Sequence, residues 1–377
     1  MTMPPKRILI IMSDAGGGHR AAAEAIREAL CHLSPDRYQI NIVDVWRNHT
    51  PWPVNRIPNS YPWLTGPGLP LWRLIWRLGQ GGRNVSLMTF VGSIVTGRGM
   101  RRLFRQWRPD LVITVHPLIN HIPLRHMRRM GLEVPFITVV TDMVTAPPVW
   151  FCPDVDYCIV PTEPARQLAL EAGLAPECVE VVGQPVSLRF AQSLGCKPDL
   201  RQKLGLDLTR PVVLLVGGGE GYGPLFSIAR AVARCGPQVQ LLVVAGRNRE
   251  LQARLEAVDW EIPTRVFGFV TNMPELMCAA DVLISKAGPG TISEAFIAEV
   301  PLILYGHIPG QEEGNVAYVR ERGAGAYVEE PLEIARLLNE WLRPGNMILA
   351  EMTSRAAALA RPEASLTIAR RIAGFLE

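Results

Sequence analysis

The chain alternates twice between short apolar runs and longer amphipathic stretches. In the first half the expected strands are Arg7–Ser13, Gln39–Val45, Asp110–Val115, Phe136–Asp142, Asp156–Pro161 and Val179–Val182. In the second half they are Val212–Gly217, Val239–Ala245, Thr264–Phe269, Asp281–Ser285, Pro301–Tyr305 and Gly325–Val328. Continuously apolar strands that alternate with helices such as Ala21–Leu33 indicate parallel sheets covered on both faces. The pattern therefore predicts an α/β protein with two doubly wound domains.

The length of 377 residues also suits two domains better than one. We place an N-terminal domain at residues 1–187 and a C-terminal domain at residues 188–360. The polar stretch Ser187–Asp207 is the expected linker. A C-terminal helix at about residues 361–377 is expected to pack back on the first domain.

Hydropathy and cysteine usage bear on the compartment. The apolar run Ile8–Met12 is shorter than the core of a signal peptide, and no run reaches the ~20 residues that span a bilayer. The seven cysteines include no C-x-x-C pair, which indicates reduced thiols. We therefore expect a cytoplasmic protein.

Charge is distributed unevenly along the chain. Between Trp46 and Arg129 there are thirteen arginines and one acid, Asp110, a formal charge of +12 in a chain whose total is +4. Five tryptophans crowd into the first part of this window: Trp46, Trp52, Trp63, Trp72 and Trp76. Cations beside tryptophans suit an anionic membrane surface. We expect a peripheral location on the inner face of the cell membrane.

Residues 71–78 are the expected membrane-contacting helix in this window. Arg73 and Arg77 share a helical stripe, which Trp72 and Trp76 flank. With Trp63 these four residues are the predicted membrane and acceptor contacts. An amphipathic helix that packs on its own domain is the alternative, and nucleic acid is disfavoured because no binding motif accompanies the arginines. The prolines and glycines of Pro51–Gly82 suggest a long, mobile excursion.

Three glycine turns follow predicted strands: Gly16–His19, Gly217–Gly223 and Gly288–Gly290. Such turns admit a diphosphate to backbone N–H groups at a helix start. Glu294, expected in the first helical turn, is placed to bind both ribose hydroxyls. No G-K-[ST] follows any of these turns, and the first lacks G-x-G-x-x-G, so nucleotide hydrolysis and dinucleotide binding are disfavoured.

Several longer motifs resemble the monogalactosyldiacylglycerol synthase family, which is related to diacylglycerol glucosyltransferases and the peptidoglycan lipid glycosyltransferase. They are Ser13–Ala21, Gly217–Pro224, Ala245–Asn248, Gly268–Thr271, Lys286–Ala295, Gly310–Asn315 and Ala360–Ala364. The resemblance implies a GT-B glycosyltransferase fold, with two Rossmann-like domains that face a cleft. It also implies a UDP-sugar donor, inversion at the anomeric carbon and neither a metal nor another cofactor.

The resemblance assigns donor-binding roles. Glu294 is similar to the ribose-binding glutamate of the family, and Phe269 and Val270 are expected to frame the uracil. The diphosphate is assigned to Gly218, Gly219, Gly288, Gly290 and Thr291. The sugar hydroxyls are assigned to Gln311, Glu312 and Asn315. Gly18, Glu220 and Arg247 complete the predicted donor site.

His19 is the predicted general base. It follows three glycines at a helix start, where the dipole favours the neutral imidazole. His116 and Asp142 follow other strands of the same domain, and Asp142 is expected to orient the base or to act as the base itself. Family members tend to carry a histidine before proline where this chain reads Ala146-Pro147-Pro148, which leaves details of the acceptor open.

We therefore expect transfer of galactose from UDP-galactose to the free hydroxyl of 1,2-diacylglycerol. UDP-glucose as donor is the first alternative. A UDP-sugar epimerase of the same fold is the second, although it leaves the basic aromatic window without a purpose. A lipid-binding adaptor without activity is the third, although it leaves the glycine turns unexplained.

Overall fold

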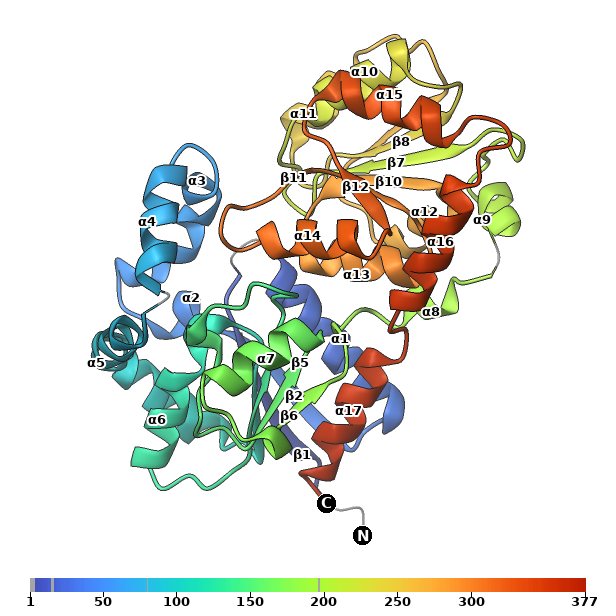
Figure 1. Ribbon diagram of the computed structural model, residues 1–377. Coiled ribbons are helices and arrows are strands. Elements are labelled where there is room, and N and C mark those ends of the chain that lie inside the picture. The colour runs from blue at the N-terminus through green and yellow to red at the C-terminus, as the bar shows by residue number, and fades with distance from the viewer. Residues whose placement is uncertain (1–3, 15–16, 80, 196) are drawn as a thin grey trace. The chain divides into compact units, whose positions relative to one another are not determined.

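The computed structural model describes residues 4–14, 17–79, 81–195 and 197–377. Gly16 of the first predicted glycine turn lies outside the described residues. The chain divides into two compact units. The first comprises Met1–Leu188, Pro309–Gln311 and Glu363–Glu377, and the second comprises Arg189–Ile308 and Glu312–Pro362. Figure 1 labels many elements of both.

The first unit is built on a six-stranded parallel sheet. Its strands are β1 (Lys6–Met12), β2 (Tyr38–Asp44), β3 (Leu111–Thr114), β4 (Phe136–Val139), β5 (Tyr157–Val160) and β6 (Val179–Val181). Their order is β2-β1-β3-β4-β5-β6, so the direction of strand addition reverses between β1 and β3. All six predicted strands are present, with ends shifted by at most three residues.

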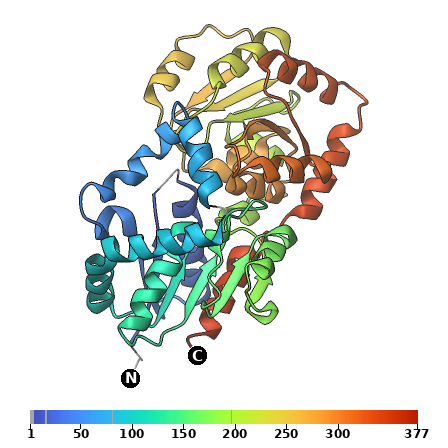
Figure 2. The same ribbon diagram turned by 60° about the vertical axis from the view of Figure 1, so that its left-hand side comes forward.

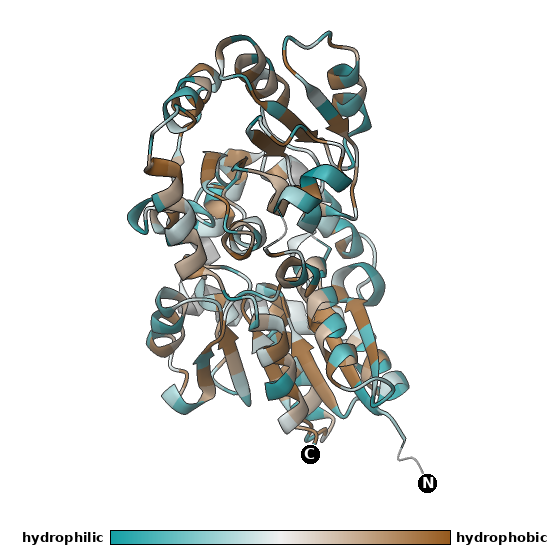
Figure 3. Cartoon of the chain, turned by 90° about the vertical axis from the view of Figure 1, so that its right-hand side faces the viewer, coloured by the Kyte–Doolittle hydropathy of each residue, from teal (hydrophilic) through white to brown (hydrophobic). Residues whose placement is uncertain are grey.

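The strand β1 is apolar without alternation because both of its faces are covered. Ile8 and Ile10 share a core with α1 (Gly18–Leu33) and α17 (Ala364–Gly374). Leu9 and Ile11 share a core on the other face with α5 (Gly82–Trp107). The brown strands of Figure 3 show this apolar interior. Consecutive buried side chains of this kind are typical of parallel sheets.

Helices fill most of the segment between β2 and β3. They are α2 (Val45–His49), η1 (Val54–Ser60), α3 (Tyr61–Leu64), α4 (Leu69–Gly79) and α5. The predicted helix at residues 71–78 is confirmed as part of α4. The excursion predicted at Pro51–Gly82 contains more helix than its prolines and glycines suggested, because Pro53 and Pro70 stand at helix starts, where proline is tolerated. Its mobility stays a prediction.

The rest of the first unit consists of short helices around the sheet. They are η2 (Pro117–Ile119), α6 (His121–Arg129), η3 (Pro148–Trp150), α7 (Glu163–Glu171), η4 (Pro176–Cys178) and α17. The helix α6 packs against α5, as Figure 2 shows. The helix α17 packs against α1, and its Ser365 exchanges two hydrogen bonds with the backbone of Val186.

The second unit has its own six-stranded parallel sheet. Its strands are β7 (Val212–Val216), β8 (Gln240–Val244), β9 (Thr264–Phe267), β10 (Val282–Lys286), β11 (Leu302–Gly306) and β12 (Gly325–Tyr327). The order β12-β11-β10-β7-β8-β9 reverses between β7 and β10. Its helices are α8 (Arg189–Gln192), α9 (Lys197–Lys203), α10 (Leu225–Cys235), α11 (Arg249–Glu256), α12 (Met273–Ala279), α13 (Pro289–Ile297), α14 (Glu313–Glu321), α15 (Pro331–Trp341) and α16 (Ile348–Leu359).

The stretch Ser187–Asp207 is more ordered than a polar linker. It forms α8 and α9 of the second unit, where Phe190 and Leu200 are buried. Arg201 explains part of its polar character, since its guanidinium is buried and lies 2.6 Å from a carboxylate oxygen of Asp281. The charges that suggested a linker are therefore used inside the fold.

Two further predictions concern the whole chain. The six cysteines that the structure describes are free thiols. None of the described helices is both long enough and apolar enough to cross a bilayer.

Candidate functional site

Two histidines meet where strand order reverses in the first unit. His19 lies at the start of α1, after Gly17, whose φ of 81° is the left-handed conformation that glycine favours. His116 follows β3, and the two imidazole centroids are 4.5 Å apart. Ligands of doubly wound sheets bind beyond the carboxyl ends of the strands at this reversal. The fold therefore places both predicted histidines in the position where a ligand is expected.

Thr141 is the residue that contacts His19 directly. Its hydroxyl oxygen Oγ1 lies 3.0 Å from Nδ1 of His19, and the residue is buried at the end of β4. Trp150 lies behind the imidazole, with ring centroids 6.2 Å apart. Neither contact was predicted, because no local motif surrounds Thr141 or Trp150.

Both histidines are neutral at pH 7. Burial lowers the pKa of His19 to about 4, although a backbone hydrogen bond to Val115 and the charge of Asp14 oppose the shift. Burial and the neighbouring His19 hold the pKa of His116 well below its usual range. Nδ1 of His116 accepts a hydrogen bond from the backbone N–H of Leu118, so the proton of the neutral ring is on Nε2. His19 is thus in the protonation state that a general base requires.

Asp142 is hydrogen-bonded to the side chains of Trp150 and Gln311. Its carboxylate accepts hydrogen bonds from Trp150 Nε1 at 2.6 Å and from Gln311 Nε2 at 3.1 Å. Gln311 belongs to the short segment that groups with the first unit. That Asp142 orients the base or acts as the base itself stays a prediction, while Thr141 is a hydrogen-bond partner of His19. The hydrogen bond from Trp150 lets Asp142 position the indole ring, which lies next to His19.

The second unit brings its glycine turns together beside the reversal between β7 and β10. The turn after β7 packs on the turn after β8, where the Arg247 N–H donates to the Gly219 carbonyl at 2.9 Å. Gly221 has a φ of 66°, and a Cβ there would lie 1.9 Å from the carbonyl oxygen of Ala245. Only glycine fits this close approach of two backbones.

Arg247 contacts two other predicted donor-binding residues, Glu220 and Phe269. Its guanidinium lies 3.0 Å from the Glu220 carboxylate and 4.2 Å from the centre of the Phe269 ring. Phe269 is 57% exposed, so it does not belong to the core. Val270 beside it is partly buried. An exposed aromatic ring and an arginine beside glycine turns suit a flat base and a diphosphate.

The helix α13 begins at the carboxyl end of β10. Gly288 is its N-cap residue and Pro289 its first residue, and no side chain caps the free N–H groups. A Cβ at Gly290 would meet open space, and Thr291 is partly exposed beside it. A helix start with free N–H groups and open space beside it is suited to an anion.

Glu294 lies in the second turn of α13, not in the first turn as predicted. It therefore does not sit among the free N–H groups that would favour its charge. Burial raises the pKa of this carboxyl to about 7. No cation lies within 4.0 Å of it among the described residues. A partly buried acid without a counter-ion among the described residues is typical of a binding site.

The predicted sugar-binding residues separate into two kinds. Glu312 is buried, forms an ion pair with Lys286, and accepts the N–H of Ile308 at 2.7 Å. Asn315 donates Nδ2 to the Ala287 carbonyl at 3.0 Å, whereas its buried Oδ1 has no partner among the described residues. Asn315 therefore keeps a free acceptor for a hydroxyl, and Glu312 is engaged in holding the loop.

The predicted membrane residues differ in exposure. Trp63, Arg73 and Arg77 are exposed. Trp72 and Trp76 are only partly exposed, because their rings pack on one another and Trp72 Nε1 donates to the Pro309 carbonyl. The exposed apolar face of α4 is instead aliphatic: it consists of Leu71, Leu74 and Ile75.

Acidic and histidine side chains do not gather as metal ligands in the described part of the chain. Asp156 of the Asp154–Asp156 sequence accepts the N–H of Phe136 at 2.7 Å. This carboxylate has a structural role at the start of β4.

The fold is shared with several solved structures. HepE of Anabaena in complex with UDP-glucose has a TM-score of 0.57 at 17% identity, covering 98% of this chain and 99% of that one. MurG of Acinetobacter baumannii has a TM-score of 0.62 at 15% identity, covering 98% and 100%. A putative UDP-N-acetylglucosamine 2-epimerase of Listeria monocytogenes has a TM-score of 0.60 at 15% identity, covering 98% and 95%. These likenesses show the GT-B fold and no more.

Sequence comparison is more specific. The family model for monogalactosyldiacylglycerol (MGDG) synthase matches residues 19–186, and that for the glycosyltransferase family 28 C-terminal domain matches residues 212–367. The chloroplastic MGDG synthase of Spinacia oleracea is 45% identical over 97% of this chain and 71% of its own length. MGDG synthase 1 of Arabidopsis thaliana is 44% identical over 97% and 70%. The chain belongs to the monogalactosyldiacylglycerol synthase family.

Proposed function

We propose that the protein transfers galactose from UDP-galactose to the free hydroxyl of 1,2-diacylglycerol, with inversion, at a membrane surface. The protein is a UDP-sugar-dependent hexosyltransferase of a family named for galactolipid synthesis. A neighbour named as a putative epimerase has the same fold, so architecture does not separate the two activities, whereas family membership does. The neutral His19 beside Thr141 is the observation that carries the mechanism.

The donor is assigned to the second unit. The Glu294 carboxylate accepts hydrogen bonds from the two ribose hydroxyls, and the N–H groups at the start of α13 bind the diphosphate. Gly218 and Gly219 offer backbone groups to the same diphosphate, while Phe269 and Val270 frame the uracil. Asn315 Oδ1 is a free acceptor for a sugar hydroxyl.

The chemistry is a single displacement. The hydroxyl oxygen of diacylglycerol attacks the anomeric carbon while its proton passes to the imidazole of His19. The bond from the anomeric carbon to UDP breaks, and the electron pair leaves with the diphosphate. Backbone N–H groups at the start of α13 stabilise that negative charge. In this proposal no metal ion or other cofactor takes part.

The lipid substrate sets the location. We infer a cytoplasmic protein, peripheral on the inner face of the cell membrane, with no nucleic acid partner. The exposed Leu71, Leu74 and Ile75 of α4 contact the lipid, and Arg73 and Arg77 contact anionic headgroups.

The test is to offer mixed micelles of diacylglycerol with labelled UDP-galactose or UDP-glucose and to identify the glycolipid. We expect monogalactosyldiacylglycerol with a β linkage, which proton couplings of the anomeric position distinguish. Product from UDP-glucose alone would assign the glucosyltransferase alternative. Interconversion of free UDP-sugars without lipid would assign the epimerase. Full activity after treatment with a chelator is the expected result for catalysis without a metal.

A further inference from the structure

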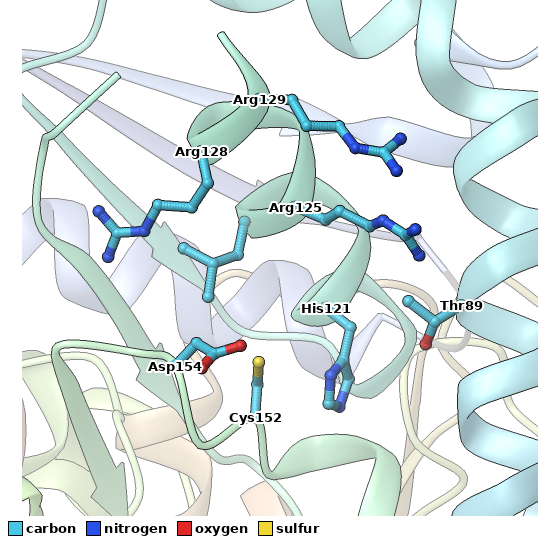
Figure 4. A pocket seen from close by; sticks show the side chains of 8 residues that line it. Thr89, His121, Arg125, Arg128, Arg129, Cys152 and Asp154 are labelled. Atoms are coloured by element: carbon cyan, nitrogen blue, oxygen red, sulfur yellow. The ribbon is translucent and has the colours of Figure 1, made fainter. Parts of the chain in front are cut away.

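The basic and the aromatic parts of the segment 46–129 are separate in the structure. Figure 4 shows Arg125, Arg128 and Arg129 of α6 in the lining of a cavity of about 760 Å³. The described lining of this cavity contains no tryptophan. The tryptophans of α4 therefore need an explanation that does not depend on these arginines.

Three rings of α3 and α4 form an aromatic cluster. Tyr61 meets Trp72 edge to face, with ring centroids 5.7 Å apart, and the Trp76 ring lies 5.9 Å from that of Trp72. All three side chains are only partly exposed, whereas Trp63 of α3 is 53% exposed. Aromatic pairs at these distances stabilise each other. The cluster therefore packs within the protein, whereas Trp63 remains available to lipid.

The two tryptophans of the cluster contact the loop Pro309–Gln311, which groups with the first unit. Trp72 Nε1 donates a hydrogen bond to the Pro309 carbonyl at 3.1 Å. Trp76 lies so close to Gly310 that a Cβ there would be 2.5 Å from its ring. Two neighbouring residues of the loop are thus each in contact with a tryptophan.

The next residue of the loop, Gln311, has its amide group oriented from both ends. The Tyr61 hydroxyl donates to Oε1 at 3.4 Å, and Nε2 donates to the Asp142 carboxylate at 3.1 Å. A carboxylate accepts hydrogen bonds and does not donate them, so the Nε2 end of the amide must face Asp142. An amide has two N–H donors and two acceptor lone pairs. The two bonds described therefore leave the amide the capacity for a further donor contact and a further acceptor contact.

This amide is connected to the proposed base through Asp142. The preceding residue, Thr141, contacts His19 through its hydroxyl. Asp142 also accepts a hydrogen bond from Trp150, which lies next to His19. In the proposed reaction His19 deprotonates the hydroxyl that attacks the anomeric carbon, so the transferred sugar must lie near His19. An amide in this position suits the hydroxyls of that sugar, since it can both donate and accept.

We propose that Tyr61, Trp72 and Trp76 are positioning residues for the donor sugar: they hold the loop so that the Gln311 amide meets a sugar hydroxyl. This role rests on the proposed function and on the sugar-binding role expected for Gln311. A loop that is ordered in advance loses less entropy when the ligand binds, so the cluster raises the affinity for UDP-galactose. It does not raise the affinity for UDP, which lacks the sugar.

The experiment measures the affinity of the protein for UDP-galactose and for UDP by calorimetry without lipid. Tyr61→Phe removes the hydroxyl that contacts Gln311, and Trp72→Phe removes the N–H that contacts Pro309. Each variant should bind UDP-galactose about threefold to tenfold more weakly, which is the usual loss for one hydrogen bond. Each should bind UDP as tightly as the wild type does.

Two matched controls remove hydrogen bonds of the same kinds elsewhere. Tyr157→Phe removes a hydroxyl that donates to Glu180 at 2.7 Å. Trp260→Phe removes an indole N–H that donates to the Leu255 carbonyl at 3.1 Å. Both controls should bind UDP-galactose as tightly as the wild type does.

Gln311→Ala shows whether Tyr61 acts through Gln311. Adding Tyr61→Phe to Gln311→Ala should cause no further loss of UDP-galactose affinity, because the group that Tyr61 holds is already absent. Losses that multiply in the double variant would overturn the positioning role.

Two other results would also overturn it. Equal weakening of UDP and UDP-galactose would show general damage to the donor site. Unchanged UDP-galactose affinity, with weaker sedimentation on vesicles of phosphatidylcholine and diacylglycerol, would show that the cluster serves lipid contact alone. A wild type that binds UDP-galactose but makes no galactolipid in the micelle assay would refute the proposed transfer, whereas weaker UDP-galactose binding by the variants would still support the positioning role. Circular dichroism and thermal unfolding verify that each variant is folded.

Discussion

Glu294→Gln should make the protein more stable and a weaker binder of UDP. Burial raises the pKa of Glu294 from 4.5 to about 7, so the folded protein holds this proton more tightly than the unfolded chain does. The free energy of unfolding therefore falls as pH rises from 4.5 to about 7. A shift of this size corresponds to at most about 3 kcal/mol, because each pKa unit is worth about 1.4 kcal/mol.

Glutamine does not titrate, so the variant avoids this cost. We expect its stability gain to be near zero at pH 4.5 and to grow to about 1–3 kcal/mol at pH 8. Thermal unfolding of variant and wild type at both pH values measures the gain, and calorimetry with UDP measures the lost affinity. Glu333→Gln is the matched control, since Glu333 also follows a proline near a helix start but is exposed. A gain that is the same at both pH values, or unchanged UDP affinity, would refute the reasoning.

Three other substitutions test the rest of the site. His19→Gln should lower kcat by a factor of about 10²–10⁴ and leave UDP affinity unchanged. In the wild type, kcat should stay level from pH 7 to pH 5 because the pKa of His19 is about 4. A fall of kcat centred near pH 6.5 would contradict this. Thr141→Val should lower kcat about threefold to tenfold through the lost hydrogen bond to His19, and Thr141→Ser should restore it; equal kcat in both variants would argue against a positioning role. Gly221→Ala should destabilise the second unit more than Gly345→Ala does, as measured by thermal unfolding. A Cβ at Gly221 meets the Ala245 carbonyl, whereas a Cβ at Gly345 meets open space. Equal losses of stability would mean that the positive φ of both glycines alone matters.

Much of the fold was predictable because buried parallel strands are continuous apolar runs. Their ends were less predictable, since apolar residues continue past the last pair of hydrogen bonds. β4 stops at Val139, although Val140 is also buried. The helices within Pro51–Gly82 were largely missed because proline and glycine lower local propensity, and the packing that overrides this preference joins residues far apart in sequence.

The donor half of the site was more accessible to sequence reasoning than the catalytic half. A glycine turn is local, so its spacing reveals it. The contact between His19 and Thr141 joins residues 122 positions apart, and no local pattern marks it. The role of Glu312 stays a prediction from the family resemblance, and its buried ion pair with Lys286 is a contact that the sequence did not reveal.

The same topological rule yields different chemistry in the two units. Each sheet reverses its strand order once, and each reversal places two strand ends side by side. In the first unit those ends lead to His19 and His116, and burial keeps both imidazoles neutral. In the second unit they lead to glycines and to a helix start, which present backbone N–H groups. A proton acceptor must be a side chain, whereas a leaving diphosphate is best stabilised by fixed dipoles that do not titrate. Each reversal therefore carries the kind of group that the proposed displacement reaction asks of it.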